Sequence, residues 1–395
     1  MDSLTIIVPT RNRAELAEWA IRSVLDQSFA GHLIVSDNSA FETQAENLWA
    51  YCRAQNDVRL SYIRPPRSMS MTEHWEWVIH EALRYTNTSH FTFLTDRMMF
   101  KYGYLPKLLA LAHPDKIVTY NHDRIDDRRI PIKLEQERWS GKLIEIKSEI
   151  LLHYFSHVHW HPALPRMLNC LVPRAALSQL AKRFGSIFGS IAPDVHFGFR
   201  VLALFDSILY WDATPIFHYA LNRSTGASVN RAEKGADAED FLAHIEGEPN
   251  YLAPVPEFRT VMNGVTHEYN LVRQETNSPK FLAVDLPSYF QTIEGEIGAI
   301  EDEEQQARMR QLLNRTRVTG PPRRLPYSLP EGSPRTVTFN SLGDAIRYAS
   351  KRERSRVEQF VHSIRGRVLL RTRLKNVLDK WIRKPKNGRD KGRLF

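Results

Sequence analysis

The chain has 395 residues, 42% of them hydrophobic and 10% aromatic, which is enough for a sizeable core in two or three structural units. Its net charge of +9 is uneven, because residues 351–395 hold 16 Lys/Arg against 4 Asp/Glu and carry +12, which leaves −3 for the rest. This composition excludes a disordered chain, and the charge points to a partner of the C-terminal tail rather than of the main part.

The two cysteines, Cys52 and Cys170, are too few for a disulfide framework and are not spaced as a metal pair. We expect both to be buried thiols in a reducing cytoplasm. The N-terminus carries an acid and no basic segment, and Pro9 interrupts its apolar run, so we expect no signal peptide. No segment approaches the roughly 20 apolar residues of a membrane span.

Strand and helix patterns alternate over the first third of the chain. Ser70 and Glu73 have the spacing of a capping box at the start of one predicted helix. The predicted strands lie at 4–9, 32–39, 60–66, 90–96 and 116–123, and the helical patterns lie at 10–27, 42–55, 68–83 and 104–113. Such alternation predicts an α/β fold with a parallel sheet covered by helices on both faces.

Polar residues follow the predicted strands, at Pro9–Asn12, Asp37–Ser39, Arg64–Arg67 and Thr95–Arg97. Ligands of open α/β sheets bind at the carboxyl ends of the strands, so we expect a binding site there. The first turn, "PTRNR", has no glycine, which argues against NAD, FAD, SAM and P-loop sites. A diphosphate would instead be neutralised by a metal ion and by arginines.

These segments resemble a known family. The string "TIIVPTRNRAELAEWAIRSVLDQSF", followed by "LIVSDNS", is similar to the opening of family 2 glycosyltransferases of the GT-A fold. The segments "FTFLTDR" and "APDVHFGFRVLA" resemble the family's acidic metal motif and the segment that carries its catalytic base. The resemblance covers about residues 1–232. It implies a Rossmann-like, mostly parallel sheet with helices on both faces, to which a helical C-terminal region is added.

The resemblance implies a nucleotide site in which Thr10, Arg11 and Asp37 contact the nucleotide. The full set of candidate nucleotide-binding residues is Pro9, Thr10, Arg11, Asn12, Asp37, Asn38, Arg64, Arg67, Arg97 and Arg223. Two alternatives remain open: Asp37 forms only an Asx-type turn, and Arg64 and Arg67 are exposed loop arginines without a role.

Asp194 matches the position of the family's catalytic base, which removes a proton from the acceptor hydroxyl. The alternative is that Asp194 is the N-cap of the helix that follows.

Asp96 is the only acid at the place where the family usually has two or three. One carboxylate, two phosphate oxygens and waters can still hold Mg²⁺ or Mn²⁺, so we expect a metal ion at Asp96. The alternatives are a metal-free mechanism, in which Arg97 and Arg223 act on the diphosphate, and a simple pairing of Asp96 with Arg97.

We expect His159, Trp160 and Arg166 to line the acceptor cleft, since aromatic rings suit sugars. His157, His159 and His161 alternate, so on a strand they would share a face, and a transition-metal site is the alternative. Residues 223–228, "RSTGAS", are either a lid over the diphosphate or an ordinary surface turn.

The sequence thus predicts a GT-A catalytic domain at 1–232, a mostly helical accessory region at 233–350 and a basic amphipathic tail at 351–395. The expected activity is inverting transfer of a sugar from a nucleoside-diphosphate sugar to a glycan or lipid-linked acceptor in surface polysaccharide synthesis. The tail is expected to bind an anionic membrane surface from the cytoplasmic side, and no nucleic acid partner is expected. The alternatives are a sugar-phosphate nucleotidyltransferase and a non-enzymatic protein held by its basic tail.

Overall fold

The fold is seen in a computed structural model, which describes residues 3–137, 139–223, 251–258, 260–300, 302–323 and 335–349. The tail at 351–395, the expected boundary at 232 and most of the possible lid at 223–228 lie outside these residues.

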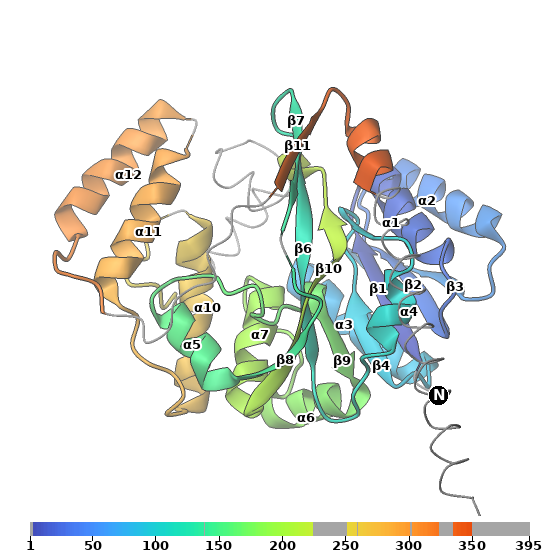
Figure 1. The fold of residues 1–395 in the computed structure, drawn as a ribbon, viewed down its shortest axis with the longest axis horizontal. Helices are drawn as coiled ribbons and strands as arrows, with labels where there is room; N and C mark the ends of the chain where they lie inside the picture. Colours follow the sequence, from blue (N-terminus) through green and yellow to red (C-terminus); the bar gives the residue numbers. More distant parts are fainter. Residues whose placement is uncertain are drawn as a thin grey trace, which may run out of the picture.

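Strands and helices alternate over the first third of the chain, as predicted, and three consecutive strands and a helix complete the first half (Figure 1). Its elements are β1 (Leu4–Thr10), α1 (Ala14–Leu25), β2 (Gly31–Asp37), α2 (Glu42–Gln55), β3 (Leu60–Ile63), α3 (Met71–Tyr85), β4 (His90–Phe93), β5 (Met98–Phe100), α4 (Tyr104–Leu109), β6 (Val118–Asp126), β7 (Ile132–Gln136), β8 (Leu143–Lys147) and α5 (Ser148–Ser156).

The described part of the second half adds further strands and helices. Its elements are η1 (Met167–Asn169), β9 (Cys170–Pro173), α6 (Arg174–Phe184), α7 (Pro193–Leu204), β10 (Ser207–His218), η2 (Leu221–Arg223), α10 (Val261–Thr276), α11 (Leu286–Gly298), α12 (Glu303–Thr316) and β11 (Arg335–Phe339). The described part of 233–345 is largely helical, as expected, but it also supplies β11, which pairs with β7.

The strands join in one sheet of mixed direction. Its order is β11-β7-β6-β9-β4-β1-β2-β3, and β10 pairs with β5, β6 and β8. The run β3-β2-β1-β4 is parallel throughout, whereas β9 is antiparallel to both of its neighbours. The α/β prediction is therefore confirmed, and the antiparallel strands are an addition that the alternation of elements did not indicate.

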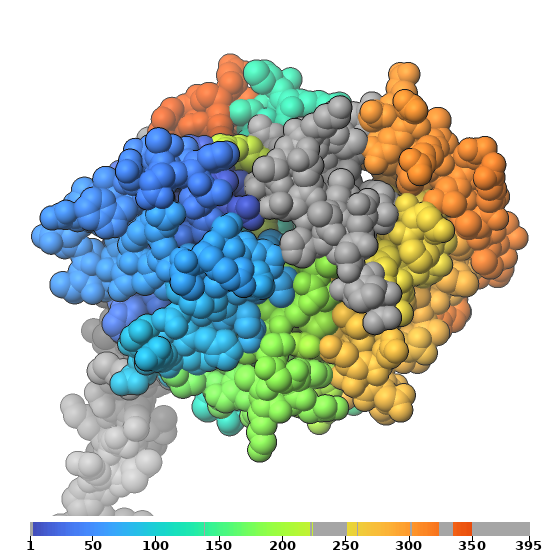
Figure 2. Space-filling model, turned by 180° about the vertical axis from the view of Figure 1, so that it is seen from behind, coloured from blue at the N-terminus to red at the C-terminus, as the bar shows by residue number. Residues whose placement is uncertain are grey.

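Helices cover both faces because β1 is apolar on both sides. Leu4, Ile6 and Val8 of β1 pack with α1, α2 and α4, whereas Ile7 lies on the other face with α3. This second core continues through α5, α6 and α7 to α10 and α11. Figure 2 shows from behind that the N-terminal elements and α10–α12 lie on opposite sides of the molecule. One hydrophobic core thus joins the sheet to the C-terminal helices.

Three local predictions were tested by these elements. Ser70 and Glu73 do form a capping box at the start of α3. Cys52 and Cys170 are both buried and free. The strand expected at 90–96 ends at Phe93, so Asp96 lies in the turn between β4 and β5 rather than at a strand end. No helix in the described ranges is long and apolar enough to cross a membrane.

Candidate functional site

The loops that follow β1 and β2 are tied together by Asn12. Its backbone has φ 55°, a left-handed conformation that asparagine tolerates better than most residues. The Asn12 side-chain oxygen accepts hydrogen bonds from the backbone N–H groups of Ala40 (2.9 Å) and Phe41 (3.1 Å). The Asn12 N–H in turn donates to the Ser39 hydroxyl at 2.8 Å. Asn12 therefore fixes the positions of the loops after β1 and β2, which form the rim of the predicted site at the carboxyl ends of the strands.

Asp37 lies at the end of β2, directly beside Thr10 of β1, and is fully buried. One of its oxygens accepts from the Ser39 N–H at 2.8 Å, which is the Asx-type turn, and the other accepts from the Tyr62 hydroxyl at 2.8 Å. The next residue, Asn38, exchanges two hydrogen bonds with the backbone of Met69, at 2.8 and 3.0 Å. Asp37 thus joins the end of β2 to Tyr62 of β3, and Asn38 joins it to the backbone of Met69.

Asp96 is buried in the turn after β4. The Thr10 hydroxyl donates to one of its oxygens at 2.9 Å, and the Arg13 guanidinium lies 3.8 Å from the other. The Tyr219 hydroxyl donates to the backbone oxygen of Asp96 at 2.8 Å and fixes the turn. Burial raises the pKa of Asp96, and the charges of Arg13 and Arg97 only partly offset it. A further positive charge near this carboxylate would therefore stabilise its ionised form.

Arg97 follows Asp96 and is itself largely buried. Burial lowers the pKa of its guanidinium, while the charge of Asp96 raises it. Its Nε atom is buried and has no hydrogen-bond partner among the described residues. A buried donor of this kind is costly unless a ligand satisfies it.

Two histidines continue the site from Arg97 towards Arg166. The rings of His122 on β6 and His218 on β10 stack with their centres 4.0 Å apart. Burial lowers the pKa of both, and the charge of Arg166 lowers both further, which holds them neutral near pH 7. The charge of Arg97 also lowers the pKa of His218. His218 is therefore within electrostatic reach of both arginines.

Asp194 is the second residue of α7. The N-cap position belongs to Ala192 and Pro193 is the first helical residue, so the N-cap alternative for Asp194 is wrong. Burial raises the pKa of its carboxyl, and the charge of Arg166 offsets this only in part. A carboxyl with a raised pKa is a stronger base than an ordinary aspartate once it is ionised.

The other predicted arginines form ion pairs with glutamates at the surface. Arg64 contacts Glu42 at 3.0 Å, and Arg67 contacts Glu73 at 2.9 Å. Arg223 forms an ion pair with Glu15. Exposed pairs of this kind contribute little to stability, so each arginine could exchange its acid for a phosphate at small cost.

Two remaining nucleotide candidates flank Thr10. Pro9 is a buried residue of β1. Arg11 lies near His74, whose pKa falls to about 4 through burial and the charge of Arg11.

The predicted acceptor residues are brought together in part. Trp160 is 40% exposed, and the Arg166 guanidinium lies 5.6 Å from the centre of its ring. The half-buried His159 precedes Trp160. The alternation of histidines is not a strand, because His157 ends α5 and Val158 has φ 57°. In the described ranges no three His, Cys, Asp or Glu side chains come together as metal ligands.

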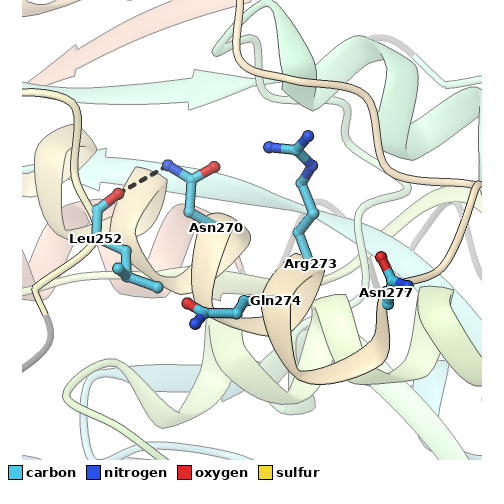
Figure 3. Close-up of a pocket in the computed structure, with 5 residues that line it drawn as sticks. All are labelled: Leu252, Asn270, Arg273, Gln274 and Asn277. Carbon is cyan, nitrogen blue, oxygen red and sulfur yellow. Dashed lines mark hydrogen bonds between the residues drawn. The ribbon is translucent and has the colours of Figure 1, made fainter.

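A cavity of about 370 Å³ lies apart from this rim, on α10. It is lined by Leu252, Asn270, Arg273, Gln274 and Asn277, of which Asn270, Arg273 and Gln274 belong to α10 and Asn277 follows its last turn (Figure 3). The Asn270 amide donates to the Leu252 backbone oxygen at 2.8 Å. None of the predicted site residues borders it.

The structure adds four residues to the predicted set: Arg13, His122, His218 and Tyr219. Arg13 stands in the turn "PTRNR", three residues after Thr10, so its spacing was a usable signal. His122 belongs to a predicted strand, but its partner His218 comes 96 positions later. Nothing local in the sequence indicates that pairing.

No protein-family model and no curated protein matches the chain. Among solved structures, the fold matches S. aureus TarS 1-349 with a TM-score of 0.42 and 14% identity, over 80% of this chain and 87% of that one. A structure of the same TarS fragment in complex with UDP matches with the same values. A longer TarS structure matches with a TM-score of 0.42 and 15% identity, over 80% of this chain and 53% of that one. The chain thus spans about half the length of the longer TarS structure.

Proposed function

We propose that this chain is an inverting glycosyltransferase that moves a sugar from a nucleoside-diphosphate sugar to a hydroxyl acceptor. The observation that carries the proposal is a pair of aspartates in different surroundings. Asp96 is buried among Thr10, Arg13 and Arg97, a setting suited to a diphosphate, whereas Asp194 is half-buried and has a raised pKa that the charge of Arg166 offsets in part. Charge stabilisation and proton removal are the two tasks of glycosyl transfer.

In the proposed reaction Asp194 takes the proton of the acceptor hydroxyl. The acceptor oxygen forms a bond to the anomeric carbon while the bond from that carbon to the diphosphate oxygen breaks. The nucleoside diphosphate leaves with the bonding electrons, and the configuration of the sugar is inverted. His159, Trp160 and Arg166 are the proposed acceptor contacts.

The diphosphate is proposed to bind to Thr10, Arg11, Arg97 and Arg223. Asp96 lies at the centre of this group of residues. A single buried carboxylate fits Mg²⁺ or Mn²⁺ only if the donor supplies further oxygens, because no three-residue ligand group exists among the described residues. When bound, such an ion would neutralise the phosphates. The second candidate mechanism uses the arginines alone, and it is favoured by the contact of Arg13 with Asp96.

Binding of the donor can be tested without knowing the sugar. A thermal-shift panel of UDP, GDP, ADP, CDP and dTDP, each with Mg²⁺ or Mn²⁺, should identify one diphosphate that raises Tm. A ligand at a hundredfold excess over its Kd stabilises the folded state by about 2.7 kcal/mol, which such a scan detects. The matching nucleosides without phosphates serve as controls. If no nucleoside diphosphate raises Tm, the proposal fails.

The polymer and the location are part of the same proposal. A glycan or lipid-linked acceptor in surface polysaccharide synthesis agrees with the family resemblance. The basic tail at 351–395 would hold the enzyme on the cytoplasmic face of an anionic membrane.

A further inference from the structure

The segment that leads into α7 is held by a carboxylate from α10. Glu268 has no exposed surface, and its Oε1 atom accepts hydrogen bonds from the backbone N–H groups of Ile191 (3.1 Å) and Ala192 (2.7 Å). These two residues come directly before Pro193, the first residue of α7. Glu268 therefore binds the backbone two and three residues before Asp194.

The other oxygen of Glu268 grips the chain just after Asp194. Its Oε2 atom lies 2.7 Å from Nδ1 of His196, which belongs to the first turn of α7. Asp194 lies midway between Ala192 and His196 in the sequence. The Glu268 side chain thus binds the backbone just before the proposed base and the His196 side chain just after it.

The preceding residues of the same segment are fixed in a similar way. Glu76 of α3 accepts hydrogen bonds from the N–H groups of Ile187 (3.1 Å) and Phe188 (2.8 Å). Ser190 has φ 58°, and its backbone oxygen accepts from the Thr72 hydroxyl at 2.7 Å. A non-glycine residue in a left-handed conformation persists only where its surroundings enforce it. Hydrogen bonds from α3 therefore fix the backbone of the segment that leads into α7.

Burying the polar Glu268 side chain has a cost in free energy, which its hydrogen bonds to Ile191, Ala192 and His196 must offset. A fully buried carboxylate is unfavourable unless hydrogen bonds compensate it, and here two N–H groups and an imidazole do so. The residue before Glu268 on α10, the buried His267, contacts the Ser190 hydroxyl at 3.1 Å. Most buried helix positions hold apolar side chains, so two adjacent polar residues aimed at one segment indicate a positional task.

We propose that Glu268 is a positioning residue, which sets the first turn of α7 so that the Asp194 carboxylate meets the acceptor hydroxyl. The proposal rests on the proposed function, since it assumes that Asp194 is the base. It also gives the helical region after residue 232 a part in the active site, because α10 lies in that region. The catalytic machinery then extends beyond the part of the chain that resembles family 2.

Three substitutions of Glu268 in the full-length chain test this role. Glu268→Gln can still accept from both N–H groups and donate to His196, so its kcat should stay close to that of the wild type. Glu268→Asp keeps the carboxyl group but is too short to reach all three partners, and Glu268→Ala removes the carboxyl group. Because a displacement of about 1 Å can cost about a hundredfold in rate, both should lose kcat on that scale while the Kd for the nucleoside diphosphate is unchanged.

A matched control is Glu296→Ala. Glu296 of α11 accepts hydrogen bonds from the Met262 N–H at 3.0 and 3.2 Å, so this change also removes a carboxylate that holds α10, but far along the chain from Asp194. Its kcat should stay near that of the wild type. Hydrogen exchange at Ile191 and Ala192 should accelerate in Glu268→Ala and Glu268→Asp, and not in Glu296→Ala.

The outcomes separate this proposal from the proposed function. If Glu268→Asp and Glu268→Gln have equal kcat while Asp194→Asn is inactive, the positioning role is refuted and the base remains. If Asp194→Asn is as active as the wild type, the base and the positioning role both fail. The Asp and Gln variants decide the matter even if Glu268→Ala does not fold.

Discussion

Asp96 is buried and Asp194 is half-buried, and the charges around the two carboxyl groups differ. Asp96 has two arginines at its carboxylate, whereas Asp194 has the charge of Arg166 beside it and the N–H groups of a helix start. Burial raises the pKa of both. Pairs of acids whose surroundings differ in this way are typical of sites that divide charge stabilisation and proton transfer between two groups.

At the residue scale, the first prediction concerns Asp194. Asp194→Asn should lower turnover by roughly 10² to 10⁴, the usual contribution of a general base, and leave nucleotide binding intact. The base acts only when ionised, so wild-type turnover should decline on the acid side at a pH above the pKa of about 3.9 of an ordinary aspartate. Turnover is measured across pH for both proteins. Near-normal turnover of the variant would refute the assignment.

The second prediction concerns Asp96. Asp96→Ala should weaken the binding of nucleoside diphosphate in Mg²⁺, and EDTA should weaken binding by the wild type. Asp57→Ala is the control, because it breaks an aspartate–arginine pair, at 2.6 Å from Arg59, outside the site. Affinities are measured by calorimetry. If affinity is indifferent to both EDTA and Asp96→Ala, the arginines alone handle the diphosphate.

At the scale of elements, Gly198 determines how closely α7 approaches the segment that carries Arg166. A Cβ atom at this position would lie 1.9 Å from the Pro165 backbone oxygen. Gly198→Ala should therefore push the two apart, cost at least about 1–3 kcal/mol and reduce turnover by moving Arg166 away from Asp194. Gly295→Ala on α11 is the control, since its Cβ would meet nothing within 4 Å. Calorimetry should show a lower Tm for Gly198→Ala and an equal or higher Tm for Gly295→Ala. An unchanged Tm in Gly198→Ala would contradict the close packing.

The elements that could be predicted are those whose causes are local. The alternation of β1 and α1 and the capping box of Ser70 and Glu73 depend on residues a few positions apart, and each is present. The contacts that shape the site are not local, since Glu268 binds the N–H groups of residues 76 and 77 positions earlier. The sequence of α10 shows only a helix with polar residues among apolar ones. The role of Glu268 therefore could not be inferred before the structure placed α10 beside α7.

The same distinction explains the errors. The alternating histidines at 157–161 were expected on a strand as one alternative, but Val158 adopts a left-handed backbone after α5 and breaks any alternation. Asp96 was expected at a strand end, yet the pairing of β4 with β1 ends at Phe93. The family resemblance located Asp37 correctly at the end of β2, but the hydroxyl that occupies its carboxylate comes from Tyr62 on the next strand. Each difference arises from a partner outside the motif.

At the scale of the whole molecule, the sheet and the C-terminal helices form a single packed unit. Ile7 of β1 and Ile293 of α11 belong to the same cluster of buried residues. The opposite charges of the two parts of the chain are nevertheless separated, with −3 up to residue 350 and +12 beyond it. A main body without a strong charge and a basic tail can therefore have different partners.

The final prediction concerns that tail, residues 351–395, which lie outside the described residues. Arginines and lysines lie between apolar residues of this tail, among them Phe360, Ile364, Val368, Leu369, Val377, Leu378, Trp381 and Ile382. A helix of this pattern can lie in the headgroup layer, where each base near an anionic surface contributes about 1 kcal/mol. The full-length chain should therefore sediment with anionic liposomes at low salt and remain in the supernatant with neutral ones. Raising the salt concentration should release it, because the attraction is screened, and removing 351–395 should abolish sedimentation without changing nucleotide binding. A full-length chain that ignores anionic liposomes at low salt would refute the membrane role, and it would leave the catalytic proposal untouched because no proposed site residue lies in the tail.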